Sequence, residues 1–230
     1  MEDHGGYGQF CPVSMAGEIL CTRWTMLIVR ELLYGSRRFN DLRRGVPRMS
    51  PALLSKRLKD LEKVGIVVIA ARDNGGVEYR LSRAGEELKP VVMSMGLWGH
   101  RWVESRLTLK NLDPSLLMWD IRRKLNPDPL PPGRCTIQFL YPELPEAQRN
   151  WWLVIDAGTV DLCNSDPGYD LNLLVRSSLH TMTAIWMGIT SIPSEIAAGR
   201  LVLEGERPVA KAMQQWMGYS PFVNEQRAVA

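Results

Sequence analysis

The chain has 230 residues and an ordinary globular composition, with 45% hydrophobic and 23% charged residues. Its 28 basic and 25 acidic side chains leave a formal net charge of only +3. No apolar run reaches the roughly 18 residues that a membrane-spanning helix needs, and the first ten residues have neither a signal-peptide nor a transit-peptide pattern. We therefore expect a cytoplasmic protein rather than a secreted or membrane protein.

The charge is distributed unevenly along the chain. Residues 1–110 carry 18 basic and 12 acidic side chains, a balance of +6, whereas residues 111–230 carry 10 and 13, a balance of −3. Such an asymmetry indicates that one half meets a polyanion and the other does not. A Pro-rich segment at residues 126–133 favours neither helix nor strand. We predict a domain at 1–110, a helical connector and Pro-rich linker at 111–133, and a second domain at 134–230.

The cysteines and histidines are too scattered to form a metal site or a disulfide framework. The four cysteines are Cys11, Cys21, Cys135 and Cys163, and none forms a Cys-x-x-Cys pair. Reduced thiols are the ordinary state of a cytoplasmic protein. We expect neither a metal nor a cofactor.

The basic half begins with short helical patterns. Apolar residues recur at three- and four-residue spacing over residues 13–33, which predicts two short helices or one bent helix. Gly35 and Ser36 end this segment, and a short helix is expected at residues 39–44 with its arginines outside.

The clearest helix start in the chain is Ser50 followed by Pro51, an N-cap residue before a first-turn proline. One arc of the predicted helix is apolar and consists of Leu53, Leu54, Leu58, Leu61 and Val64. The opposite side is small and cationic and consists of Ala52, Ser55, Lys56, Lys59 and Lys63. Gly65 then ends the helix. Arg57 lies beside the apolar arc, so we expect it to pair with Asp41 or Glu31 rather than to contact a base.

A hairpin and a long helix follow. The β-branched runs at 66–71 and 77–81 are joined by residues 72–76, whose Asn-Gly pair is a strong hairpin signal. From Arg83 a long helix is expected, and its apolar stripe reaches Trp102 and Val103. A small domain needs only part of that stripe, so we expect the rest to pack on a second copy of the chain.

Three short helices followed by a two-stranded hairpin predict a winged helix-turn-helix. A helix fits the major groove, its small residues allow close approach, and its lysines meet phosphates. Arg72 at the base of the hairpin would reach the minor groove or the backbone. Phosphate contacts that position the domain are expected from Arg37, Arg38, Arg43 and Arg44. A Lys-rich face can also be merely solvated, but three cationic elements around one capped helix favour DNA.

A series of short motifs runs through this half in order. They are Cys-Pro-Val at 11–13, Arg-Trp-Thr at 23–25, Arg-Glu-Leu-Leu at 30–33, Arg-Phe-Asn-Asp-Leu at 38–42, Ser-Pro at 50–51, Leu-Ser-Lys-Arg-Leu at 54–58 and Glu-Tyr-Arg-Leu-Ser at 78–82. Over about residues 10–105 the chain thus resembles the HxlR family of bacterial transcription regulators. The resemblance implies a dimer, formed through terminal helices, on a roughly palindromic operator. It puts Arg72 on the wing, and on the recognition helix it puts Ser50, Pro51, Ala52, Ser55, Lys56 and Lys59.

The same resemblance raises an alternative mode of sensing. Some members of the family sense electrophiles or oxidants through a cysteine at the position of Cys11, where the thiolate is the reactive form. The alternative function is therefore a thiol-based redox or electrophile sensor acting through Cys11. The plainer interpretation makes Cys11 a small apolar residue at the dimer surface.

The acidic half predicts an α+β layer. Strand-like runs lie at 135–141, 151–156, 159–164, 170–175 and 201–204, and helical patterns lie at 116–125, 178–187, 193–198 and 208–217. We find no nucleophile elbow, phosphate loop or paired carboxylates, and we interpret His180 as a polar residue at a pocket edge. We therefore expect no enzymatic activity.

Tryptophan and methionine crowd into this half, which suits an adaptable small-molecule cavity, although ordinary core packing gives the same composition. Residues 134–217 resemble the sterol carrier protein type two-like fold, on Trp-Leu-Val-Ile-Asp at 152–156, Asp-Leu-Asn-Leu at 170–173 and Leu-Glu-Gly at 203–205. That resemblance implies an internal cavity for apolar ligands. Its candidate walls are Met182, Trp186, Met187, Met213 and Met217.

Together these features predict an α+β homodimer: an N-terminal winged helix-turn-helix regulator with a C-terminal, sterol-carrier-like, ligand-sensing domain. We expect a repressor that a small apolar effector releases from its operator. Two alternatives stay open. In one, Cys11 senses and the second domain only reinforces the dimer; in the other, the chain is a lipid carrier with a vestigial DNA-binding domain.

Overall fold

The computed structural model describes residues 6–72, 75–104, 109–110 and 112–229. They form two compact units, which divide between Gly96 and Leu97. The predicted domain bounds at residues 110 and 133 stay a prediction. Asp73 and Asn74, in the predicted hairpin loop, lie outside the described residues. No helix among the described residues is both long and apolar enough to cross a membrane.

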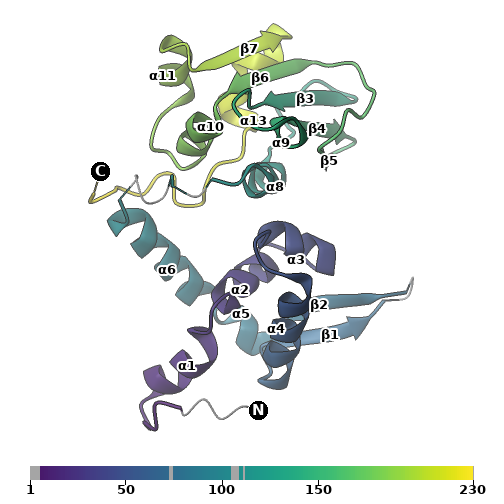
Figure 1. Ribbon diagram of the computed structural model, residues 1–230. Helices are drawn as coiled ribbons and strands as arrows, with labels where there is room; N and C mark the ends of the chain where they lie inside the picture. Colours follow the sequence, from purple (N-terminus) through teal and green to yellow (C-terminus); the bar gives the residue numbers. More distant parts are fainter. Residues whose placement is uncertain (1–5, 73–74, 105–108, 111, 230) are drawn as a thin grey trace. The chain divides into compact units, whose positions relative to one another are not determined.

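The first unit is helical, with one two-stranded hairpin (Figure 1). Its elements in chain order are α1 (Pro12–Leu20), α2 (Thr25–Leu33), α3 (Phe39–Gly45), α4 (Pro51–Lys63), β1 (Val67–Ala71), β2 (Val77–Leu81), α5 (Arg83–Glu86) and the first part of α6 (Lys89–Trp102). This order confirms the predicted winged helix-turn-helix. The segment at 13–33 forms two helices because the chain turns at Trp24, whose φ of 78° lies in the left-handed region.

The long helix predicted from Arg83 is wrong, because the chain forms two helices there. Pro90 lies in the first turn of α6, and a proline has no N–H with which to continue the hydrogen bonds of α5. In α5, Gly85 packs against the carbonyl oxygen of Ile66, where a Cβ atom would clash. This contact holds Ile66, which directly precedes β1, against α5.

Residues of α2, α3 and α4 and of both strands form the core of the first unit. Its buried members include Ile28, Val29, Leu32, Leu42, Val46, Leu54, Leu58, Leu61, Ile66, Val67, Tyr79 and Leu81. Leu54, Leu58 and Leu61 confirm the apolar arc predicted for α4. Val64 departs from that arc and is 49% exposed, because α4 ends at Lys63 and Val64 is its C-cap.

A buried carboxylate joins α2 to α3. Glu31 is fully buried, and its Oε1 lies 2.8 Å from Nη2 of Arg30. The hydroxyl of Ser36 donates a hydrogen bond to Oε2 at 3.3 Å. The Glu31 side chain packs directly on Gly45, where a side chain would clash with the carboxylate. Nη2 of Arg30 also donates to the carbonyl of Gly45 at 3.1 Å, so both residues tie α2 to the end of α3.

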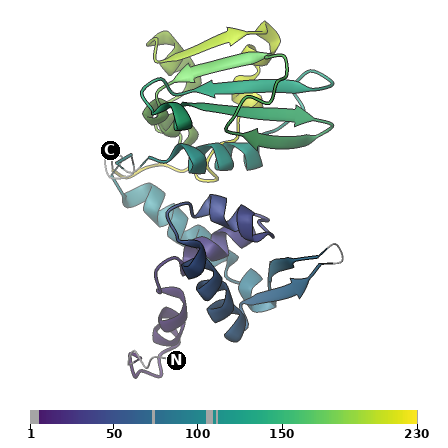
Figure 2. The ribbon, with the colours of Figure 1, turned by 45° about the vertical axis from the view of Figure 1, so that its right-hand side comes forward.

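The second unit is a five-stranded sheet with helices (Figure 2). Its elements are α8 (Pro114–Lys124), β3 (Cys135–Leu140), α9 (Glu146–Arg149), β4 (Asn150–Asp156), β5 (Thr159–Cys163), β6 (Leu173–Ser177), α10 (Leu179–Trp186), α11 (Ile192–Ala197), β7 (Leu201–Gly205), α12 (Arg207–Lys211) and α13 (Met213–Trp216). The strand order is β5-β4-β3-β6-β7, in which β3 and β6 are parallel and the other pairs antiparallel. The predicted α+β class is confirmed.

Strand alternation gives the sheet a buried face. Ile137, Leu153 and Val175 are buried in the core, whereas the neighbouring Gln138 and Trp152 are only partly buried on the other face. The helix predicted at 208–217 is two short helices, α12 and α13, which meet at Ala212.

The helix α8 and the Pro-rich segment contribute side chains to this core. Met118 and Ile121 of α8 are fully buried in it, together with Leu130 from the Pro-rich segment. The N–H of Asn126 donates to the carbonyl of Trp216 at 3.0 Å. Proline excludes helix and strand from this segment but does not prevent it from packing.

Candidate nucleic-acid interface

The helix α4 has the features of a recognition helix. The Ser50 hydroxyl accepts a hydrogen bond from the N–H of Leu53 at 3.3 Å, which confirms the N-cap, and Pro51 occupies the first turn. Three leucines bury one side of the helix. The residues exposed to solvent include Pro51, Ala52, Lys56, Lys59, Glu62 and Lys63, and Ser55 is partly exposed.

Most of the arginines in and next to α3 are exposed, whereas Arg37 is partly buried and bonded to the backbone. Arg38 is the N-cap residue of α3 and is exposed, as are Arg43 and Arg44 in its last turn. Arg44 lies 3.6 Å from Asp41 in an exposed pair. Arg37 is partly buried, and its Nη1 donates to the carbonyl of Leu32 at 3.5 Å.

The partner predicted for Arg57 is wrong. Its Nη1 lies 3.1 Å from Oδ2 of Asp60, one turn further along the same helix. Asp41 pairs with Arg44 instead, and Glu31 pairs with Arg30. The expectation that Arg57 pairs with a carboxylate is confirmed.

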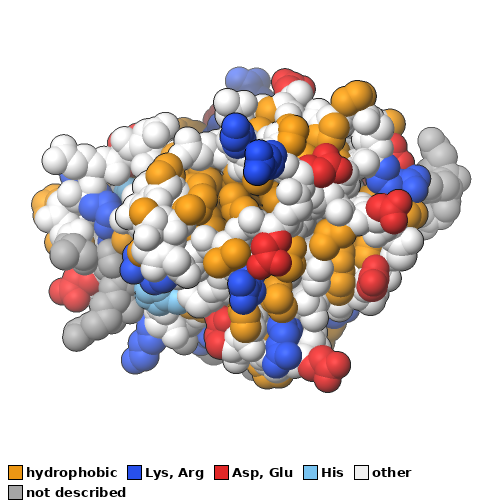
Figure 3. Space-filling view, turned by 90° about the horizontal axis from the view of Figure 1, so that it is seen from above, with side chains coloured by type: hydrophobic (Ala, Val, Ile, Leu, Met, Phe, Trp, Pro, Cys, Tyr) orange, Lys and Arg blue, Asp and Glu red, His pale blue; other side chains and the backbone are white. Residues whose placement is uncertain are grey.

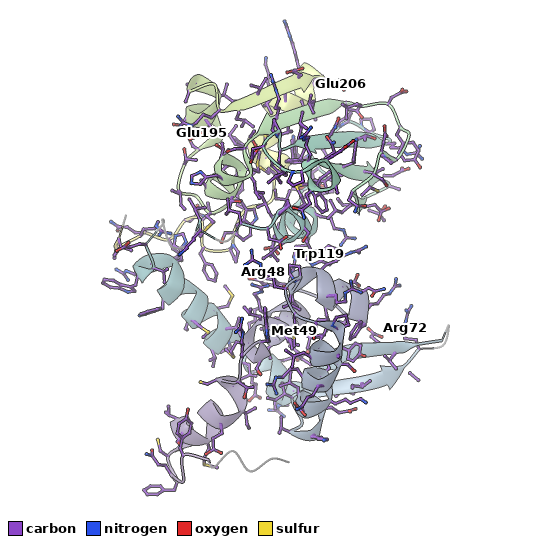
Figure 4. All side chains as sticks on the ribbon, in the orientation of Figure 1. Arg48, Met49, Arg72, Trp119, Glu195 and Glu206 are labelled. Atoms are coloured by element: carbon purple, nitrogen blue, oxygen red, sulfur yellow. The ribbon has the colours of Figure 1, made fainter. Side chains whose placement is uncertain are left out.

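The hairpin forms a wing with Arg72 where its turn begins. The strands pair from Val67 opposite Leu81 to Ala71 opposite Val77. Arg72 follows β1 directly, so it lies at the turn of the wing and not at its base (Figure 4). Its N–H donates to the carbonyl of Gly76 at 3.1 Å, and Gly76 has the positive φ of 84° that this turn requires.

The wing is tied to the arginines before α3. The N–H of Tyr79 donates to the carbonyl of Arg37 at 2.9 Å. The pKa of Glu78 is lowered, first by its hydrogen bond from Arg80 and also by the charges of Arg37 and Arg72. All three arginines therefore act on the carboxylate of Glu78, and Arg80 forms an ion pair with it at 2.8 Å.

An exposed cation without a predicted role, Arg48, lies in the turn between α3 and α4. Arg48 is exposed there, next to the buried Met49 (Figure 4). Its position, three residues before the start of α4, is the signal that could have identified it. In helix-turn-helix motifs the N-terminal residues of the recognition helix contact the bases. A cation in this turn lies close to that end of α4.

Figure 3 draws one face, on which basic, acidic and hydrophobic side chains are interspersed. The elements proposed to meet DNA lie side by side: α4, which carries the exposed Lys56 and Lys59, contacts β1, and Arg72 follows β1 directly.

The predicted effector residues lie within or against the core of the second unit. Met182, Met213 and Met217 are buried there, and Trp186 and Met187 are partly exposed. The indole Nε1 of Trp186 is buried and has no hydrogen-bond partner within the described residues. Ordinary core packing, the plainer interpretation of this composition, is compatible with this arrangement. A ligand cavity in this core stays a prediction.

Cys11 is exposed at the N-terminus of α1, where it is the N-cap residue. The backbone N–H groups of Ser14 and Val13 lower the pKa of the Cys11 thiol below its ordinary value. Of the other cysteines, Cys135 is buried, and burial raises its pKa to about 11.

Comparison with known proteins gives one matching family and several similar regulators. The family described as HxlR-like helix-turn-helix matches residues 19–107. The HTH-type transcriptional regulator YvaP of Bacillus subtilis is 35% identical over 99 residues, which are 42% of this chain and 92% of YvaP. The regulator sll1512 of Synechocystis is 34% identical over 99 residues, 42% of this chain and 73% of that protein. Among solved structures, the reduced form of the regulator YodB from B. subtilis is 31% identical, covers 42% of this chain and 97% of YodB, and has a TM-score of 0.38.

Proposed function

The chain belongs to the HxlR-like helix-turn-helix family of DNA-binding transcription regulators, and from this premise we propose that it is a homodimeric repressor of a roughly palindromic operator. The observation that carries the proposal is α4: a capped helix with one leucine face buried and Ala52, Lys56 and Lys59 exposed. Small side chains at its start allow entry into the major groove, and the lysines meet phosphates. The wing with Arg72 contacts the flanking backbone or minor groove.

The proposed dimer rests on apolar side chains that the chain leaves in solvent. On and before α1, Phe10 and Val13 are 98% and 79% exposed, and α1 contains no buried residue. On α6, Trp98 and Trp102 are 63% and 52% exposed. Exposed apolar groups of this size mark an interaction surface on each of these two segments. A second copy would cover them, and its two recognition helices would match two half-sites.

A titration of labelled duplex DNA tests the DNA-binding proposal. The duplex carries the region upstream of the protein's own gene, and fluorescence anisotropy reports binding. We expect binding at least about a thousandfold tighter than to a random duplex of the same length, since base contacts add to the phosphate contacts. Equal affinity for the two duplexes would contradict operator recognition.

We further propose that the second unit senses a small apolar effector and that effector binding releases the operator. The support is the set of flexible thioethers at Met182, Met213 and Met217, which repack more easily than branched side chains, and the unpartnered indole N–H of Trp186. The effector would favour a dimer arrangement in which the spacing of the recognition helices no longer fits the operator.

Native mass spectrometry of the purified protein tests the dimer and the effector together. We expect twice the chain mass plus the mass of a co-purifying apolar molecule, which organic extraction removes. A monomer would contradict the dimer. A dimer without added mass, whose Trp fluorescence is unchanged by apolar compounds, would contradict the effector.

A second candidate function is sensing through Cys11, favoured by the exposure of this thiol and its lowered pKa. A lowered pKa raises the fraction of reactive thiolate at neutral pH. If Cys11 is the sensor, Cys11→Ser abolishes the release of DNA by diamide or a quinone, whereas Cys21→Ser, at a second exposed thiol, leaves it intact. A Cys11→Ser protein with its full response would exclude this function.

A further inference from the structure

The last residues of the chain form a strap within the second unit. Residues 218–229, which we call the C-terminal strap, follow α13 and lead to the end of α6 (Figure 1 and Figure 2). Leu97 and the later residues of α6 belong to the second unit, as does the whole strap. Contacts between the strap and this end of α6 therefore lie within one compact unit.

The first part of the strap is held at the end of α10. The N–H of Ser220 donates a hydrogen bond to the carbonyl of Trp186 at 2.9 Å. Trp186 is the last residue of α10, and the last carbonyls of a helix have no partner within it. Val223 packs on Gly188, where a Cβ atom would clash with it. The strap thus caps α10 and covers the turn that follows it.

The far end of the strap caps α6 in the same way. The N–H of Ala228 donates to the carbonyl of Arg101, in the last turn of the helix, at 2.9 Å. Nη2 of Arg227 donates to the carbonyl of Val103, which follows the helix, at 2.7 Å. A guanidinium here is also attracted by the partial negative charge of the helix C-terminus. Two carbonyls at the end of α6 therefore depend on the strap for their partners.

A buried histidine joins α6 to the middle of the strap. His100 is 7% exposed, and its Nε2 lies 3.1 Å from the carbonyl oxygen of Glu225. Because a carbonyl oxygen only accepts, Nε2 carries the proton. The centroid of the His100 ring lies 6.4 Å from that of Phe222. The end of α6 is therefore in contact with the strap at several points between residues 222 and 228.

We propose that the strap couples α10 to the end of α6, so that a displacement of α10 loosens the last turn of α6 and weakens the dimer. The dimer part rests on the homodimer proposed above. Trp98 and Trp102, the exposed apolar groups of that dimer surface, lie just before and within the last turn of α6. Trp186, whose carbonyl the strap caps, is one of the predicted effector residues. An effector that moves Trp186 thereby acts on the dimer surface through the strap.

Hydrogen exchange measured by mass spectrometry tests the capping of α6. Deleting residues 224–230 removes the partners of α6 and leaves Ser220 and Val223 at the end of α10. We expect the amides of residues 97–103 to exchange at least about tenfold faster, the effect of losing one hydrogen bond. Residues 135–140, the central strand β3, should exchange as in wild type because the sheet is retained. Unchanged exchange at residues 97–103 would contradict the capping.

A substitution at the other end of the strap tests whether the effect is transmitted. Val223→Asp puts a charge against Gly188 and is expected to detach the strap from the end of α10. We expect faster exchange at residues 97–103 here too, although Arg227 and Ala228 stay in the chain. Gln226→Ala, at an exposed position of the strap, is the matched control and should leave this exchange unchanged. Wild-type exchange at residues 97–103 in Val223→Asp would overturn the coupling.

Sedimentation velocity over a concentration series separates the coupling from the dimer on which it rests. We expect the deletion and Val223→Asp each to raise the dimer dissociation constant at least about tenfold, since a frayed last turn must be ordered again before Trp102 can pack. Gln226→Ala should dimerise like wild type. Equal dissociation constants in all four proteins would overturn the control of dimerisation. If wild type is monomeric while the exchange changes as expected, the proposed dimer fails and the coupling of α10 to α6 stands.

Discussion

Replacing Lys56 and Lys59 together by alanine is expected to weaken binding to the upstream duplex by at least about a hundredfold. Both lysines are exposed on α4, on the side opposite its buried leucines. A lysine that neutralises a phosphate releases a counterion from the DNA, so without each lysine the slope of log affinity against log salt should become shallower by about 0.9. Fluorescence anisotropy over a series of salt concentrations measures both the affinity and the slope.

Lys211→Ala is the matched control, because this lysine is exposed on α12 in the second unit. It removes one positive charge without touching the proposed interface, and it should leave the affinity within about twofold. Circular dichroism should give the same melting temperature for all the variants, since the three side chains are exposed and surface substitutions usually have small effects. A double variant that binds like wild type would place the interface elsewhere.

Glu31→Ala is expected to cause the largest loss of stability among single substitutions in the helix-turn-helix. The carboxylate is fully buried and joins Arg30 and Ser36 beside Gly45. Removing one member of a buried ion pair costs about 3–5 kcal/mol. Arg30 is 25% exposed and keeps some hydration, so we take about 3 kcal/mol, the lower end of that range.

A calorimetric melt of the first unit within the full chain measures this effect. A loss of this size lowers the melting temperature of a domain of this length by roughly 10–20 °C. Glu62→Ala is the control, since Glu62 is an exposed glutamate on α4, and it should shift the melt by less than about 3 °C. Equal melting temperatures for the two variants would show that the buried carboxylate does not hold α2 and α3 together.

Local signals were sufficient to predict α4, the helix that we propose reads DNA. The Ser50 cap, the first-turn proline and the arc of leucines are all properties of one short stretch of consecutive residues, and each is present in the structure. The wing was predictable for the same reason, since its two β-branched runs are short local patterns, and they pair as an antiparallel hairpin.

What the sequence could not predict depends on where segments pack. The Pro-rich segment looks like a linker because proline excludes regular structure, yet Leu130 is buried in the second core. The side-by-side placement of Glu18 of α1 and Arg57 of α4 is another case, because both line one pocket although they lie far apart in the sequence. By contrast, the true partner of Arg57 was predictable, since Asp60 lies three residues away on one helix face.

The salt dependence of binding to the upstream duplex tests the central claim most directly. If α4 and its surrounding arginines meet DNA phosphates, wild-type affinity should fall at least about a thousandfold between roughly 50 and 200 mM salt, as it does for proteins that make six or more phosphate contacts. Affinity that does not change with salt, or no binding to this duplex at either concentration, would contradict the claim.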